Sequence, residues 1–121
     1  MSAQPIRRHF SEAPSVVYER ETHGVAAESR RLVKRSDGTR LGMHHATIEA
    51  PADYAGVHEE DMVFYALAGA GTVFVDDEEH AFGPGVAVLV KGGSRYRHVV
   101  PDETQTVLLL FSPAPTEGHH H

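Results

Sequence analysis

Histidine is the residue of this chain with the widest chemical use. The chain has ten histidines and no cysteine. Three of the histidines end the chain, and the other seven are spread along it: His9, His23, His44, His45, His58, His80 and His98. Because imidazole titrates near neutral pH and binds transition metals, these side chains offer either acid–base catalysis or metal coordination. The absence of cysteine excludes disulfides and thiolate metal sites.

The spacing of these residues predicts which of them share a site. Side chains of a β-strand alternate between two faces, so residues two apart point the same way. Tyr96 and His98 are therefore expected on one face of a strand. His44 and His45 are adjacent, so at most one of them can serve any single site.

Turn signals divide the chain into short runs that are typical of β-strands. An Asp-Gly pair between such runs favours a hairpin, because glycine accepts the positive φ of a tight turn. The signals are Asp37-Gly38, Asp76-Asp77, Gly83-Pro84-Gly85 and Gly92-Gly93. They recur about every eight to twelve residues, and no stretch has the pattern of a long amphipathic helix. This pattern predicts an all-β protein built as an antiparallel barrel or sandwich.

Length and charge limit the classes of protein to which the chain can belong. The chain has 121 residues, which fits one domain, and a formal net charge of −6. We expect an arm over residues 1–14, a barrel over 15–116 and a purification-tag remnant over 117–121. The acidic balance argues against a nucleic-acid partner, and no apolar run approaches the ~20 residues of a membrane span. We expect a cytoplasmic protein that has no membrane partner.

Two segments, 56–71 and 83–98, resemble the two signature motifs of the cupin superfamily. The resemblance extends from Leu41 to Phe111 and implies an RmlC-like jelly-roll, the double-stranded β-helix barrel of that family. When Gly69 is aligned with the glycine of the first motif, Met62 occupies the usual glutamate position and His58 the second histidine position. When Gly85 is aligned with the glycine of the second motif, Tyr96 occupies its histidine position. Only His58 remains in place among the four usual metal ligands.

The resemblance also implies which residues line the barrel. By comparison with related cupins Thr47 faces inward, and Met43 and His45 then share its face. The expected cavity holds His45, Thr47, His58, Tyr96 and His98, and its apolar walls are Met43, Met62 and Phe64. We expect Thr47, Met43, Met62 and Phe64 to contact a substrate.

Two kinds of chemistry remain open for this cavity. His45, His58 and His98 could hold a divalent metal such as zinc, iron, nickel or manganese. Without a metal, His45 or His58 could remove a proton while Tyr96 orients a substrate oxygen. His58, His45 and Tyr96 are therefore the candidate catalytic residues, and no organic cofactor is implied.

The function class follows from the family. The chain bears a distant resemblance to ectoine synthase-type and polyketide cyclase-type cupins. This implies an enzyme acting on a small organic metabolite as a lyase, cyclase, isomerase or metal-dependent dioxygenase. The alternative is a metal-free cupin that binds a small molecule without catalysis. We expect a homodimer, because single-domain cupins commonly pair through their outer sheet.

Overall fold

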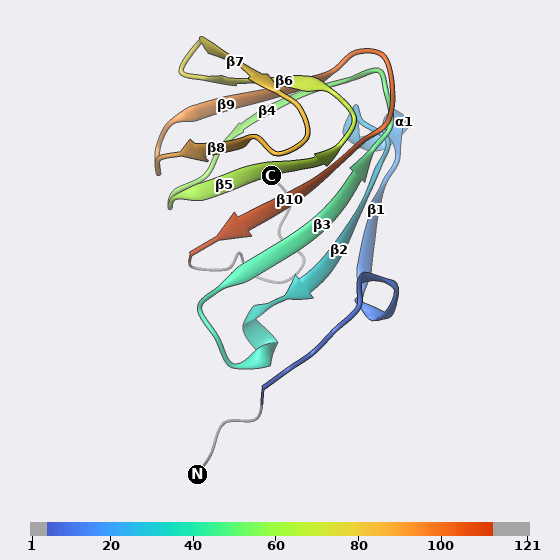
Figure 1. Cartoon of the computed structure of the whole chain (residues 1–121), viewed down its shortest axis with the longest axis vertical. Helices are drawn as coiled ribbons and strands as arrows, with labels where there is room; N and C mark the ends of the chain where they lie inside the picture. The colour runs from blue at the N-terminus through green and yellow to red at the C-terminus, as the bar shows by residue number, and fades with distance from the viewer. Residues whose placement is uncertain (1–4, 113–121) are drawn as a thin grey trace.

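Two antiparallel sheets make up the protein in the computed structural model, which describes residues 5–112. The six-stranded sheet has the order β1-β2-β3-β10-β5-β8 and the four-stranded sheet the order β4-β9-β6-β7. In Figure 1 the four-stranded sheet lies above β8 and β5, and the longer sheet continues below it toward β1. The strands are β1 Ser15–Tyr18, β2 Ala27–Val33, β3 Gly42–Ile48, β4 Ala52–Val57, β5 Met62–Ala68, β6 Gly71–Val75, β7 Glu78–Phe82, β8 Ala87–Val90, β9 Arg95–Val100 and β10 Gln105–Phe111. This is the all-β jelly-roll arrangement that the sequence predicts.

In the part of the chain that the structure describes, helical structure is confined to three short turns. They are the 3₁₀ turns η1 (Phe10–Glu12) and η2 (Arg35–Asp37) and the four-residue α1 (Arg20–His23). Within residues 5–112, none of these is long or apolar enough to cross a membrane.

The chain before β1 lies along the outside of its own barrel. Arg8 pairs with Asp37 of η2 at 2.9 Å and donates to the carbonyl oxygen of Leu32. Phe10 stacks on His45 of β3, with ring centroids 4.7 Å apart. The expected tag remnant at 117–121 falls outside the described residues.

The predicted turns join strands that are consecutive in the chain. Asp76 and Asp77 join β6 to β7 with φ angles of 48° and 71°, which aspartate tolerates better than most residues. Gly69 ends β5 with a φ of 80°, and a Cβ atom there would lie 2.5 Å from the carbonyl oxygen of Thr104. Only glycine fits that position. Its lack of a side chain allows the end of β5 to approach the start of β10 closely.

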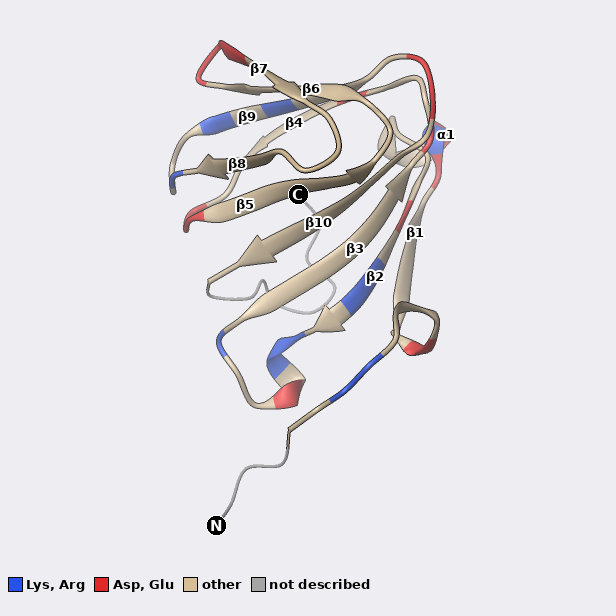
Figure 2. Cartoon of the chain, viewed as in Figure 1, with Lys and Arg blue, Asp and Glu red and all other residues tan. Residues whose placement is uncertain are grey.

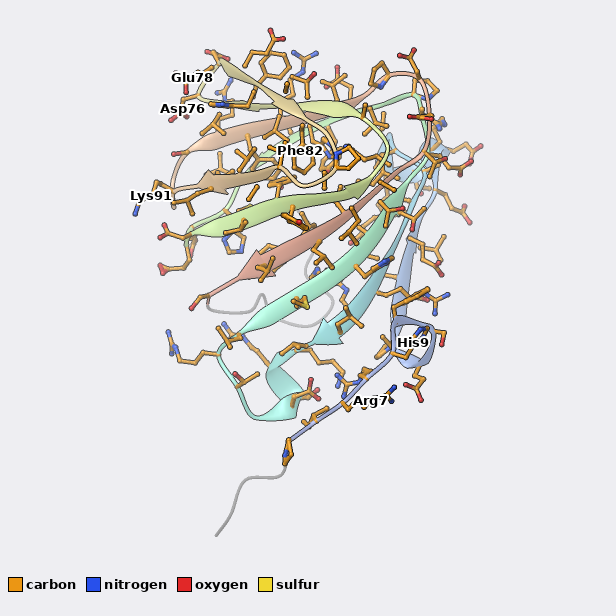
Figure 3. All side chains as sticks on the ribbon, in the orientation of Figure 1. Arg7, His9, Asp76, Glu78, Phe82 and Lys91 are labelled. Carbon is orange, nitrogen blue, oxygen red and sulfur yellow. The ribbon has the colours of Figure 1, made fainter. Side chains whose placement is uncertain are left out.

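The inner faces of the strands form one core. Its largest fully buried members are Tyr96, Phe64, Phe82, Met62 and His98. Figure 3 shows Phe82 inside the barrel, whereas Asp76, Glu78 and Lys91 extend from its edges. A histidine buried among these apolar groups requires partners for both ring nitrogens.

The outer face of the six-stranded sheet carries no charged residue over β3, β10, β5 and β8 (Figure 2). Met43, Leu110, Val63 and Leu89 are successive partners across these strands and form a continuous row. Leu89 is 55% exposed. We call these four residues the outer apolar row.

Candidate functional site

A cavity of about 250 Å³ lies between the two sheets. Its apolar lining includes Ile48 on β3 and Met62 and Phe64 on β5. Its polar lining comes from both sheets and from the β1–α1 segment: Tyr18, His23, Ser29, Arg31, His44, Tyr54 and Tyr96. The cavity thus combines apolar walls with a small number of polar groups, which is typical of a small-molecule site.

An arginine and a histidine on adjacent strands form one polar wall. Arg31 of β2 and His44 of β3 are directly paired in the register of the two strands. Arg31 Nη1 lies 3.1 Å from His44 Nε2, and Arg31 Nη2 donates to the Tyr18 hydroxyl at 3.2 Å. Because a guanidinium group can only donate, His44 Nε2 accepts this hydrogen bond.

Arg31 carries a buried positive charge that has no acidic partner among residues 5–112. Its exposure is 8%, and no aspartate or glutamate of residues 5–112 forms an ion pair with it. Its Nε and the hydroxyl of Ser29, two residues earlier on the same face, are buried without hydrogen-bond partners. Buried charges and polar groups are normally satisfied, so this wall lacks an acceptor that carries negative charge.

A hydrogen-bond chain links Tyr54 of the four-stranded sheet, which lines the cavity, to Gln105 of β10. Gln105 donates its amide nitrogen to the carbonyl oxygens of Phe82 at 2.8 Å and Gly69 at 3.3 Å. Its own carbonyl oxygen lies 2.7 Å from His98 Nε2, which must therefore carry the proton. His98 Nδ1 then accepts from the Tyr54 hydroxyl at 2.8 Å.

The buried position of this chain fixes its protonation. Burial lowers the pKa of His98 below its usual value, although the Gln105 hydrogen bond acts in the opposite direction. Burial also raises the pKa of Tyr54 far above its usual value, and the neighbouring tyrosines add to this. His98 is therefore neutral and Tyr54 protonated at neutral pH.

Four of the predicted site residues face inward. Met62, Phe64 and Tyr96 line the cavity, as the motif alignment implies. His98 is buried on the same face of β9 as Tyr96 but does not line the cavity; it is hydrogen-bonded to Tyr54, which does. Because both ring nitrogens of His98 are hydrogen-bonded, neither is available to a metal in this arrangement.

The predicted inward face of β3 is wrong. Its buried residues include His44, Ala46 and Ile48, while Met43, His45 and Thr47 lie on the outer face. These three side chains therefore do not line the cavity, and His45 packs against Phe10 instead. The alternation of apolar and polar residues over 46–49 indicated the correct face, but the prediction followed the resemblance to related cupins instead.

His58 lies beyond the end of β4 and outside the cavity lining. Its Nδ1 is 2.9 Å from the backbone carbonyl oxygen of Glu60, and its ring packs against Phe111 at a centroid distance of 5.1 Å. The structure therefore does not bring His45, His58 and His98 together. Within residues 5–112, no group of three histidine, aspartate or glutamate side chains could hold a metal ion.

Tyr96 occupies the space of a further expected ligand. A Cβ atom at Gly56, the first histidine position of the motif, would lie 2.9 Å from the Tyr96 hydroxyl oxygen. The tyrosine therefore fills the space that a side chain at position 56 would need. The described donor set does not fit a resident metal ion.

Sequence reasoning missed six polar residues of the cavity: Tyr18, His23, Ser29, Arg31, His44 and Tyr54. Arg31 carried a signal, because it shares its strand face with Ala27 and Ser29 and not with the Glu28–Arg30 ion pair. A charged residue on the apolar face of a strand is unusual and points to a site. Tyr54 carried no such signal, because tyrosine is common in strands.

The cupin domain family matches residues 46–112 of the chain. The chain belongs to the cupin family. This match includes Tyr54, Met62 and Tyr96 of the cavity, whereas Ser29 and Arg31 precede it.

Named relatives of this cupin lie at low sequence identity. An L-ectoine synthase from Nocardia farcinica is 28% identical over 107 residues, which covers 85% of this chain and 80% of the relative. Among solved structures, the polyketide cyclase RemF from Streptomyces resistomycificus has a TM-score of 0.75 at 21% identity, covering 93% of this chain and 81% of its own. Ectoine synthase from P. lautus has a TM-score of 0.74 at 20% identity, covering 93% and 80%. These two structures show the shared fold.

Proposed function

We propose that this cupin is an enzyme that binds a small organic carboxylate in the cavity and converts it by lyase, cyclase or isomerase chemistry. The observation that carries the proposal is the buried Arg31, which has no acidic partner among residues 5–112. Leaving a guanidinium charge in this state costs several kcal/mol, and a carboxylate is the group that matches its fork of donors. The Ser29 hydroxyl beside it supplies one more donor.

The other walls restrict what the carboxylate is attached to. Met62, Phe64 and Ile48 present apolar surface, which favours a hydrocarbon or aromatic skeleton. A volume of about 250 Å³ suits a small metabolite and is below the usual range for drug-sized ligands.

Proton transfer is the chemistry that these residues offer. His44 lies against the guanidinium group, and Tyr96 lines the same cavity. A carboxylate held at Arg31 would place its neighbouring carbon atoms close to these groups, where a proton could be removed or delivered. Relatives named as a synthase and a cyclase are consistent with such non-redox reactions. Dioxygenase chemistry requires a metal, and the described donor set does not fit one.

Ligand binding tests the carboxylate site directly. We would measure thermal unfolding of the wild-type protein with sodium salts of straight-chain and aromatic monocarboxylates and with their methyl esters. A salt at ten times its Kd adds about 1.4 kcal/mol to the free energy of unfolding, and its neutral ester should add nothing. Arg31→Met should abolish the effect. Arg30→Met is the matched control, because Arg30 is adjacent on the same strand and pairs with Glu28 on the outer face.

The results of these experiments distinguish an enzyme from a cupin that only binds a ligand, and from one that has no carboxylate site. If no carboxylate stabilises the protein more than its ester does, the carboxylate site is refuted. The best-binding acids would then be incubated with the protein and followed by proton NMR. Binding without turnover of any of them would favour the alternative, a cupin that binds a small molecule without catalysis.

A further inference from the structure

Tyr54 is fixed in one hydrogen-bonding direction by groups that are distant in the sequence. Two backbone carbonyl oxygens, those of Phe82 and Gly69, orient the Gln105 amide. That amide orients the His98 imidazole, and the imidazole orients the Tyr54 hydroxyl. No hydrogen bond of this series can be reversed alone, because turning the Gln105 amide over would point its oxygen at two carbonyl oxygens.

This direction determines what Tyr54 offers to the cavity. Its single proton is donated to His98 Nδ1, so only the lone pairs of its oxygen remain for another partner. The lowered pKa of His98 keeps Nδ1 unprotonated, and the raised pKa of Tyr54 keeps the hydroxyl proton in place. At neutral pH the Tyr54 oxygen is therefore an acceptor and not a donor toward the cavity.

The acceptor and the guanidinium group belong to different sheets. Tyr54 lies on β4 of the four-stranded sheet, and Arg31 lies on β2 of the six-stranded sheet. Both line the same cavity, whose remaining wall is largely apolar. A molecule that fills this space meets donors at one wall and an acceptor at the other.

We propose that Tyr54 is a specificity-determining residue, which selects ligands that carry an O–H or N–H donor in addition to the carboxylate held by Arg31. The inference rests on the proposed carboxylate site and names the second group of its ligand. A carboxylate without a donor would fill the cavity and leave the Tyr54 lone pairs without a hydrogen bond from the ligand. Hydroxy, amino or amide-bearing acids therefore bind more tightly than acids with a plain hydrocarbon tail.

The first test concerns the direction of the chain and needs no ligand. In ¹⁵N-labelled wild-type protein at neutral pH, NMR should show His98 with a proton on Nε2 and none on Nδ1. Tyr54→Phe should shift the Nδ1 resonance, and the control Tyr65→Phe, on the outer face of β5, should leave it unchanged. A proton on Nδ1 in the wild-type protein would mean that Tyr54 donates to the cavity, and the proposal would be overturned.

The second test concerns selectivity. Binding of short straight-chain ω-hydroxy carboxylates would be compared with acids in which a methyl group replaces the hydroxyl. In the pair whose length fits the cavity, the hydroxy acid should bind about ten-fold more tightly. Tyr54→Phe should remove this preference, and the control Tyr65→Phe, on the outer face of β5, should keep it.

The outcomes distinguish this inference from the function on which it rests. Binding that depends on Arg31 but shows no preference in any pair overturns the role of Tyr54 and leaves the carboxylate site standing. Absence of binding by every acid overturns both. If Tyr54→Phe does not fold, the preference of the wild-type protein within each pair still decides the question.

Discussion

Replacing Arg31 with methionine should stabilise the protein while removing its ligand binding. The guanidinium group is 8% exposed and has no acidic partner among residues 5–112, so its burial costs about 3–5 kcal/mol. Its removal also takes a donor from His44 Nε2 and from the Tyr18 hydroxyl, each worth about 1 kcal/mol. Methionine keeps most of the packing volume. The difference is a gain of about 1–3 kcal/mol in the free energy of unfolding.

Urea unfolding followed by circular dichroism measures this change, and calorimetry should show a Tm increase of about 4–10 °C. Arg30→Met is again the control, and its half-exposed ion pair with Glu28 should be worth less than about 1 kcal/mol. A loss of stability greater than about 1 kcal/mol in Arg31→Met alone would refute the reasoning. The hydrogen bonds of Arg31 to Tyr18 and His44 would then stabilise the packing of β1, β2 and β3.

Three further predictions concern pH, metal content and assembly. The pKa of His98 is lowered in the folded protein. As the pH falls below about 6.5, His98 is therefore protonated in the unfolded chain at a higher pH than in the folded protein. Stability should therefore decrease below that pH by at most about 1.4 kcal/mol per pH unit, and urea titrations of His98→Gln should show a smaller slope between pH 7 and 5. Elemental analysis after tag removal should find well under one equivalent of zinc, iron, nickel or manganese, and a chelator should leave the Tm unchanged; a full equivalent would contradict the donor geometry. We also propose a homodimer through the outer apolar row, so light scattering should show a dimer. Leu89→Lys should dissociate this dimer, whereas the control Val57→Lys should not, because Val57 is equally exposed but lies on the other sheet. A monomeric wild-type protein would rule the dimer out.

The sequence predicted the fold well because its turns depend on local chemistry. Gly69 and the Asp76-Asp77 pair specify backbone conformations that few other residues adopt. The facing of β9 was also predictable, because Tyr96 and His98 alternate with arginines that remain exposed. Local alternation is sufficient wherever one face of a strand is charged and the other is not.

The site was less predictable because its organisation is not local. The prediction of the inward face of β3 was wrong because it was based on other cupins, although the apolar residues Ala46 and Ile48 indicated the correct face. The role of His98 depends on Gln105 and on backbone carbonyls from two further segments. No spacing within one strand indicates that both nitrogens of that imidazole are already bonded.

The contact between Tyr96 and Gly56 makes these two positions interdependent in any redesign or evolutionary change. A histidine introduced at position 56 alone would collide with the tyrosine, since even its Cβ atom would lie 2.9 Å from the hydroxyl oxygen. Shortening Tyr96 alone would leave a void against the glycine, at the cost of packing in the core. A cupin with this pair is therefore separated from a cupin with histidines at both positions by intermediates that are each less stable. The order of substitution matters, and position 96 has to become smaller before position 56 can become larger.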